Sequence, residues 1–244
     1  MVLLEPGERI DQLSPQGIQI IQSAQVFAFS LDAVLLADFA QVKGHSRVVD
    51  LAAGNGAVGL FVAKKTDQLV TLVELQPRLA NMAKRSVALN QLTNVEVMNG
   101  DLAQAPTQIA KDSVDVVTCN PPYFKVGADS VTNPNQHLAL ARHELTTDFA
   151  TVCRVAADLL KYQGKLFLVH RPDRLAELLT TLENYHLAPK RIRFVHPKAD
   201  REANMVLIEA IKAGKPDGIR IVPPVVVYDA DNHYQAEVAQ LLGK

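Results

Sequence analysis

A short polar and aromatic motif follows an apolar segment near the middle of the chain. The segment 114–119 has the composition of a buried strand, and Asn120, Pro121, Pro122 and Tyr123 come directly after it. A planar amino nitrogen is a poor nucleophile, because its lone pair is delocalised into the attached π system. Two fixed acceptors, the Asn120 side-chain oxygen and the Pro121 carbonyl, can hold its N–H groups and turn the lone pair towards an electrophile. The prolines stiffen this backbone, and Tyr123 can stack on a flat ring for about 1–3 kcal/mol. These four are the candidate catalytic residues; the alternative is that they merely end a strand.

A glycine-rich turn follows an earlier apolar segment. The stretch DLAAGNGAVGL, residues 50–60, contains a G-x-G-x-x-G pattern. The pattern alone is a weak signal, because dinucleotide-binding proteins and ordinary strand-to-helix turns also contain it. Asp50 precedes the first glycine, and a carboxylate there would repel a pyrophosphate. It suits a ligand with a cationic part and no phosphate, such as S-adenosylmethionine, which carries an ammonium and a sulfonium. We expect the following residues of this turn to bind the cofactor: Asp50, Ala52, Gly54, Asn55 and Gly56.

Acidic residues also follow the next two apolar segments. Glu74 lies 20 residues after Gly54, where a carboxylate can accept hydrogen bonds from both hydroxyls of a ribose. Asp101 can accept from an adenine amino group, and Leu102 can offer its backbone N–H to a ring nitrogen. We expect Leu75, next to Glu74, to contact the cofactor as well. A surface glutamate or a helix N-cap would explain Glu74 or Asp101 singly, but acidic residues after three successive strands favour one shared ligand.

Alternating apolar segments and helical patterns are expected to position these residues. We predict strands at 47–53, 69–75, 94–101, 114–119, 164–171, 190–197 and 203–212, and helices at 57–65, 77–90, 102–110, 144–161, 173–185 and 233–242. This alternation predicts an α/β fold with a Rossmann-like, mostly parallel sheet and helices on both faces. The last two strands have no helix between them, so the last strand should be antiparallel. In such sheets, ligands bind beyond the carboxyl ends of the strands.

The first 46 residues have a different pattern. Segment 9–25 reads as a hairpin around a Ser-Pro-Gln-Gly turn, and segment 30–40 as a helix with Ser30 as its N-cap. We predict that residues 1–46 form a small N-terminal cover within the same domain. Residues 47–244 are then the main, cofactor-binding domain.

Several of these motifs together resemble one enzyme family. DLAAGNG (50–56), Glu74, the Gly-Asp pair at 100–101 and NPPY (120–123) resemble class I S-adenosylmethionine-dependent methyltransferases of the NPPY group. FSLDAVLLADFA (29–40) is most similar to the bacterial tRNA1(Val) (adenine-37-N6)-methyltransferase family. The resemblance implies a seven-stranded sheet with an antiparallel last strand, S-adenosylmethionine as cofactor, and methyl transfer to N6 of an adenine beside a tRNA anticodon. It also implies that Asp32 and Asn120 lie near the cofactor.

The NPPY motif names a reaction and leaves its acceptor open. Enzymes that methylate protein glutamine, ribosomal RNA or DNA share the motif, and they are alternatives to the tRNA adenine assignment. An NAD-dependent oxidoreductase and a non-catalytic binding module are alternatives from other classes. Asp50 and the NPPY motif argue against the oxidoreductase, and the intact NPPY motif argues against the binding module.

Basic residues supply candidate contacts to a nucleic acid. Lys125 and Arg142 lie in the polar stretch 124–144, a long loop that we expect to close over the target base. A second basic segment lies near residues 190–201, and a solvated edge strand is the alternative interpretation of it. From this segment we expect four phosphate contacts, namely Arg191, Arg193, Lys198 and Arg201.

The composition is that of an ordinary globular protein. The chain has 244 residues, 48% of them apolar and 21% charged, and a net charge of −1. No apolar run of about 18 residues occurs, which predicts no membrane span, and a secretory signal is lacking, so we expect a cytoplasmic protein. Two cysteines are too few for a disulfide framework. The seven histidines show no ligand spacing, so we predict no metal.

Overall fold

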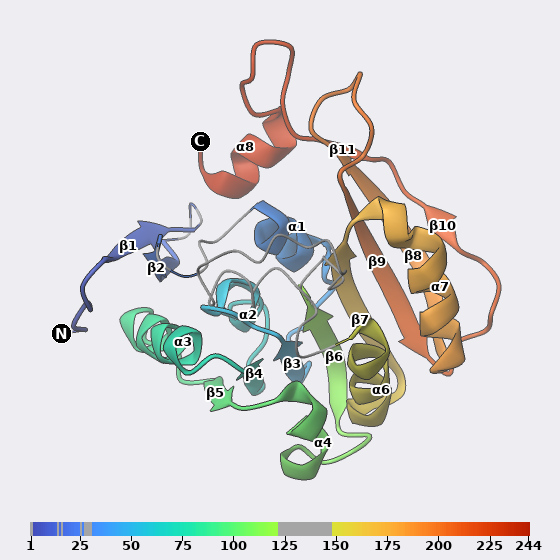
Figure 1. The fold of residues 1–244 in the computed structure, drawn as a ribbon, viewed down its shortest axis with the longest axis horizontal. Helices are drawn as coiled ribbons and strands as arrows, with labels where there is room; N and C mark the ends of the chain where they lie inside the picture. Colours follow the sequence, from blue (N-terminus) through green and yellow to red (C-terminus); the bar gives the residue numbers. More distant parts are fainter. Residues whose placement is uncertain (1, 14, 16, 25, 27–30, 122–147) are drawn as a thin grey trace, which may run out of the picture.

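One large sheet with helices on both faces dominates the structure (Figure 1). The computed structural model describes residues 2–13, 15, 17–24, 26, 31–121 and 148–244. The strands of the sheet are β3 (Val48–Leu51), β4 (Val70–Glu74), β5 (Val95–Asn99), β6 (Val114–Cys119), β7 (Leu160–His170), β8 (Leu187–His196), β9 (Met205–Lys212), β10 (Arg220–Ile221) and β11 (Val225–Val226). Their order is β10-β8-β9-β7-β6-β3-β4-β5, and β11 also pairs with β8.

The strand directions confirm the predicted fold class. β5, β4, β3, β6 and β7 are mutually parallel. β9 is antiparallel to both β7 and β8, so β8 runs in the same direction as β7. These seven strands are the seven that the sequence predicts, with the last one antiparallel. β10 and β11 extend the sheet beyond β8, in parallel with it.

Two apolar layers cover the two faces of this sheet. One layer contains α1 (Leu31–Phe39), α2 (Ala57–Ala63), part of α3 (Pro77–Leu89) and part of α8 (Ala236–Leu242). The other contains η1 (Leu102–Gln104), α4 (Ala105–Gln108), α6 (Phe149–Leu159) and α7 (Leu175–Asn184), which follows the short η2 (Pro172–Arg174). Successive strand residues point to opposite faces, and Val48 accordingly joins the first layer while Val49 joins the second. Both faces are therefore apolar, which leaves the strand ends for polar chemistry.

Some element boundaries differ from the predicted ones. α6 ends at Leu159 because Leu160 has an extended conformation and pairs with Val114 at the start of β7, four residues before the predicted strand. The predicted helix at 102–110 is shorter and begins as the 3-10 turn η1. α8 begins at Ala236 instead of residue 233, because Tyr234 forms a bridge with Tyr228.

The N-terminal segment forms the predicted hairpin. β1 (Glu8–Gln12) and β2 (Gln19–Ser23) are antiparallel. The hairpin is fixed to α3, because the Ile21 N–H donates to Ser86 Oγ at 3.0 Å and Arg85 pairs with Glu8 at 2.6 Å. The predicted N-cap Ser30 lies outside the described residues, and the division at residues 46 and 47 stays a prediction. Within the described part of the chain, every helix falls short of the length and apolar character that crossing a membrane requires.

Candidate active site

The centre of the sheet brings Asp50 beside Thr118. The two residues are register partners on β3 and β6, and both are buried. Thr118 Oγ1 donates a hydrogen bond to Asp50 Oδ1 at 2.6 Å. The other carboxylate oxygen, Oδ2, is buried and has no hydrogen-bond partner among the described residues. A buried acceptor without a partner is unfavourable, so a ligand donor that binds Oδ2 would remove an energetic cost.

Burial also changes the protonation of Asp50. Loss of water raises the pKa of its carboxyl from 3.8 to about 7, and the nearby Glu74 carboxylate adds to this increase. The hydroxyl of Thr118 and the backbone N–H of Gly59 act in the opposite direction, because they favour the ionised form. A cationic ligand group at this carboxylate would also favour the ionised form and lower its pKa.

The glycine turn after β3 connects this carboxylate with the end of β4. Ala52, Gly54 and Gly56 all have positive φ values, of 55°, 59° and 91°, a region that glycine adopts readily and other residues rarely adopt. A Cβ added to Gly54 would meet no atom within 4 Å, so the turn has open space above it. In contrast, a Cβ on Gly59 would lie 2.0 Å from Leu72 Cδ2. Gly54 thus leaves open space beside the turn, whereas Gly59 allows α2 to pack closely on β4.

Glu74 is buried at the carboxyl end of β4. Its Oε2 accepts from the Gly54 N–H at 2.8 Å, and its Oε1 accepts from the Gln76 N–H at 2.7 Å. Burial raises the pKa of Glu74, and these backbone N–H groups lower it. A carboxylate oxygen has two lone pairs, so each oxygen can still accept one hydroxyl. The carboxylate is therefore rigidly held and suited to a diol.

The rim of the site is formed by the ends of β4 and β5. The Asn99 side-chain amide donates to the carbonyl oxygens of Glu74 and Leu75, at 2.9 and 3.0 Å. Leu75 is 38% exposed and presents apolar surface at this edge. Asp101 is exposed and accepts from the Ala103 N–H at 2.8 Å, so it acts as the N-cap of η1, as its alternative interpretation had it. Leu102, the next residue, is buried.

Asn120 and Pro121 follow β6 at the same edge of the sheet. Asn120 is half-buried and Pro121 is buried. Because β3, β4 and β6 are parallel, their carboxyl ends bring Asp50, Glu74 and Asn120 to one edge. The other two motif residues, Pro122 and Tyr123, lie outside the described residues, as do Lys125 and Arg142. The structure thus places Asn120 and Pro121 at the same edge of the sheet as the two buried carboxylates.

Comparison with known proteins assigns this arrangement to a family. The profile of the methyltransferase small domain matches residues 18–195. The chain belongs to this methyltransferase family. The match confirms the predicted enzyme class, and membership implies S-adenosylmethionine as the methyl donor.

Individual relatives and solved structures agree with this assignment. A tRNA1(Val) (adenine(37)-N6)-methyltransferase from Bacteroides thetaiotaomicron is 33% identical over 165 residues, which are 66% of each chain. A protein of the same name from Porphyromonas gingivalis is 25% identical over 240 residues, covering 95% of this chain and 93% of the relative. The crystal structure of a predicted O-methyltransferase from Agrobacterium tumefaciens is similar, with a TM-score of 0.69, 25% identity, and coverage of 87% of this chain and 95% of that one.

Two of the predicted cofactor residues have other contacts in the methyltransferase. The Asn55 side chain is buried and donates to the Ile21 carbonyl at 3.1 Å, which ties the glycine turn to the N-terminal hairpin. Asp32 is buried at the start of α1, where its Oδ1 accepts from the Ala33 N–H at 3.0 Å. The contact of Asn55 gives its side chain a structural role, and the predicted places of Asn55 and Asp32 at the cofactor stay predictions.

The predicted phosphate contacts divide into two groups. Arg191 forms an ion pair with the buried Glu209 at 2.8 Å and stacks on Phe39, and Arg193 pairs with Glu237 at 2.7 Å. Their side chains are only 15% and 18% exposed, so both arginines are engaged by internal ion pairs, and their predicted phosphate contacts stay a prediction. The solvent-exposed edge that the sequence allowed as an alternative also does not describe them. The partner of Arg191 lies on the neighbouring strand β9 and that of Arg193 on α8, so a run of basic residues read alone does not reveal either pairing.

Lys198 and Arg201 lie in the loop after β8. Because β8 is parallel to β7, this loop is at the same edge of the sheet as Asn120. Lys198 Nζ donates to the Ala230 carbonyl at 2.9 Å, and Arg201 is exposed. Of the four basic residues predicted from this segment, these two therefore lie in a loop at the same edge as Asn120, and their contact with a substrate stays a prediction.

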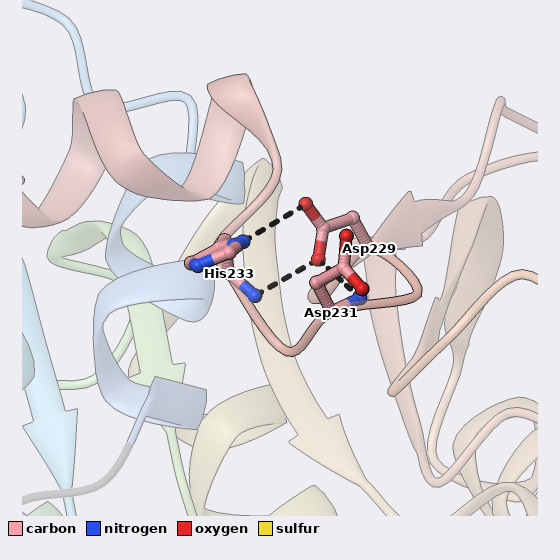
Figure 2. A group of neighbouring side chains, drawn as sticks. All are labelled: Asp229, Asp231 and His233. Atoms are coloured by element: carbon pink, nitrogen blue, oxygen red, sulfur yellow. Dashed lines mark hydrogen bonds and ion pairs between the residues drawn. The ribbon is translucent and has the colours of Figure 1, made fainter.

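A group of potential metal ligands lies in the loop before α8, next to Lys198, which donates to the Ala230 carbonyl of the same loop. Figure 2 shows Asp229, Asp231 and His233 together, with ligand atoms that all lie within 4.8 Å of one another. Asp229 Oδ1 accepts from the backbone N–H groups of Asp231 and His233, each at 2.9 Å, and Oδ2 lies 3.4 Å from His233 Nδ1. These bonds shape the loop, and they lower the pKa of Asp229. They account for the grouping without an ion.

Proposed function

We propose that this methyltransferase transfers a methyl group from S-adenosylmethionine to N6 of an adenine in tRNA, at the anticodon-adjacent adenine of tRNA Val. The observation that carries the proposal is the position of Asn120 and Pro121 at the same strand edge as the buried carboxylates Asp50 and Glu74. The choice of tRNA is supported by the names of the relatives from Bacteroides thetaiotaomicron and Porphyromonas gingivalis.

The described residues fit the methyl donor. Asp50 offers a buried carboxylate oxygen without a partner, which suits a cation. Glu74 is held by backbone N–H groups, and the lone pairs that remain on its carboxylate can accept from the ribose hydroxyls. Gly54 leaves open space beside them, and Leu75 offers exposed apolar surface for the adenine ring. A dinucleotide fits less well, because Asp50 would repel its phosphates.

The main requirement of methyl transfer is that the acceptor nitrogen is held in the correct orientation. Deprotonation of this nitrogen by a strong base is not required. S-adenosylmethionine supplies an electrophilic methyl group on a sulfonium. The Asn120 side-chain oxygen and the Pro121 carbonyl accept hydrogen bonds from the amino group, and this turns its lone pair towards the methyl group. Positioning of this kind can lower an activation barrier by about 7–11 kcal/mol. No strong base is needed, because the nitrogen loses its proton readily once it is alkylated.

An exposed single-stranded base suits this edge of the sheet. An adenine in an anticodon loop is already unpaired, so extruding it requires little energy. Lys198 and Arg201 lie at the same edge and are available for contacts to the phosphates. Tyr123, Lys125 and Arg142, which the sequence assigns to the substrate, stay predictions.

The proposal is tested by identifying the acceptor. The purified protein is incubated with labelled S-adenosylmethionine and either total tRNA or total protein from a strain that lacks the gene. We expect label in tRNA, and nucleoside mass spectrometry should identify it as N6-methyladenosine. Label in a protein glutamine instead would overturn the tRNA proposal and favour the alternative acceptor.

A further inference from the structure

The hydrogen bond between Thr118 and Asp50 has no part in the chemistry described above. It joins two buried residues on adjacent central strands, with 2.6 Å between Oγ1 and Oδ1. The hydroxyl satisfies one carboxylate oxygen and leaves Oδ2 without a partner among the described residues. Because one oxygen is fixed, the direction of the second is fixed as well.

We propose that Thr118 is a positioning residue for the methyl donor, whose hydroxyl holds Oδ1 of Asp50 and leaves Oδ2 to accept the donor's ammonium group. This inference rests on the proposed function, since it needs Asp50 to face S-adenosylmethionine. Thr118 itself contacts neither the donor nor the reacting atoms. It acts only through the Asp50 carboxylate.

The surroundings of Asp50 make this hydroxyl important. Glu74 on β4 is a second carboxylate that opposes ionisation of Asp50, and Cys119 on β6 is a buried thiol whose own pKa is raised well above its usual value. The hydroxyl of Thr118 and the N–H of Gly59 favour the ionised form. An ammonium binds the ionised carboxylate far better than the neutral acid. Without Thr118, a larger fraction of Asp50 is protonated at neutral pH.

The test uses calorimetric titration with S-adenosylhomocysteine, which carries the ammonium group, between pH 6 and pH 8.5. Thr118→Val removes the hydroxyl and keeps the shape of the side chain, and Thr118→Ser keeps the hydroxyl. Thr71→Val is a matched control, because Thr71 is also a buried strand threonine whose Oγ1 donates to a carboxylate, Glu96, at 2.6 Å. As a control ligand, 5′-methylthioadenosine contains the nucleoside without the ammonium.

The proposal predicts a deficit that depends on pH. Loss of one hydrogen bond to a charged group raises the acid pKa by about one, so Thr118→Val should bind about tenfold more weakly at pH 6. The deficit should shrink as the pH rises to 8.5. Thr118→Ser should restore the wild-type profile, and Thr71→Val should leave it unchanged. Binding of 5′-methylthioadenosine should be the same in all four proteins.

Wild-type protein gives an independent readout that needs no variant. Because Asp50 must ionise when the ammonium binds, titration in buffers of different ionisation enthalpy should detect proton release at pH 6 and little at pH 8.5. A Thr118→Val deficit that is equal at every pH, or no deficit, would overturn the role of Thr118. Absence of proton release at pH 6 would do the same. If wild-type protein does not bind S-adenosylhomocysteine at all, the proposed function itself fails.

Discussion

Substitution Asp50→Asn is expected to stabilise the protein at alkaline pH and to weaken its binding of the methyl donor. Asp50 is fully buried, and its pKa is raised to about 7 from 3.8. A carboxyl with a raised pKa in the folded state stabilises the fold below its unfolded pKa, and this contribution is lost as the pH rises through the folded pKa. Asparagine has the same shape and does not titrate, so it removes this dependence.

The structure gives the size of the effect. The difference between a pKa of about 7 and one of 3.8 corresponds to about 4 kcal/mol of unfolding free energy. About 3 kcal/mol of this stabilisation is lost as the pH rises from 5 to 8.5, because the folded protein retains a proton on Asp50 that the unfolded chain has released. At the position of Oδ2, the new amide N–H groups have no acceptor among the described residues, which costs about 1–3 kcal/mol at every pH. Asp50→Asn should therefore be more stable than wild type by about 1–3 kcal/mol at pH 8.5.

The assay is urea unfolding of both proteins at several pH values between 5 and 8.5. The chain contains no tryptophan, so circular dichroism is the suitable signal. The difference between the two unfolding free energies should grow with pH, while the affinity for S-adenosylhomocysteine falls at least about tenfold because a charge-assisted hydrogen bond is lost. A stability difference that stays constant over this range would refute a raised pKa for Asp50.

Four further substitutions separate folding from binding. Gly59→Ala should lower stability by about 1–3 kcal/mol in urea unfolding, because its Cβ would lie 2.0 Å from a leucine of β4; wild-type stability would contradict the close packing. Glu74→Gln should lower S-adenosylhomocysteine affinity in calorimetry, and it should also destabilise the fold because its amide would meet a backbone N–H, such as that of Gly54. Arg191→Ala should destabilise by about 3 kcal/mol, since it removes one of the cations that pair with a buried carboxylate. Lys198→Ala should leave stability within about 0.5 kcal/mol and weaken tRNA binding. Wild-type stability of Arg191→Ala, or wild-type tRNA binding of Lys198→Ala, would contradict these assignments.

The convergence of the site could be predicted from the sequence. Parallel strands bring their carboxyl ends to one edge, so acidic and amide residues after successive apolar segments must gather there. Asp50, Glu74 and Asn120 do so in the structure. The antiparallel direction of β9 was also predictable, because the link after β8 is too short for a parallel crossover.

Other features depended on contacts that are distant in the sequence. The pairing of Arg191 with Glu209 connects two strands, and a run of basic residues read alone suggests a phosphate site instead. Asn55 lies within a glycine motif, yet its side chain reaches the hairpin at Ile21. β10 and β11 have two residues each, too few to show a periodic pattern. Thr118 was hidden inside an apolar segment, and only its register with Asp50 reveals its contact.

The central claim is that Asn120 orients the acceptor amino group and that the methyl donor binds independently of it. Single-turnover methylation of tRNA by the Asn120→Ala variant tests this claim most directly, with S-adenosylhomocysteine affinity measured on the same preparation. We predict affinity within about twofold of wild type and a rate lower by about 100-fold or more, because misplacement of a reacting group by 1 Å can have that effect. A variant that forms N6-methyladenosine at the wild-type rate would contradict the account.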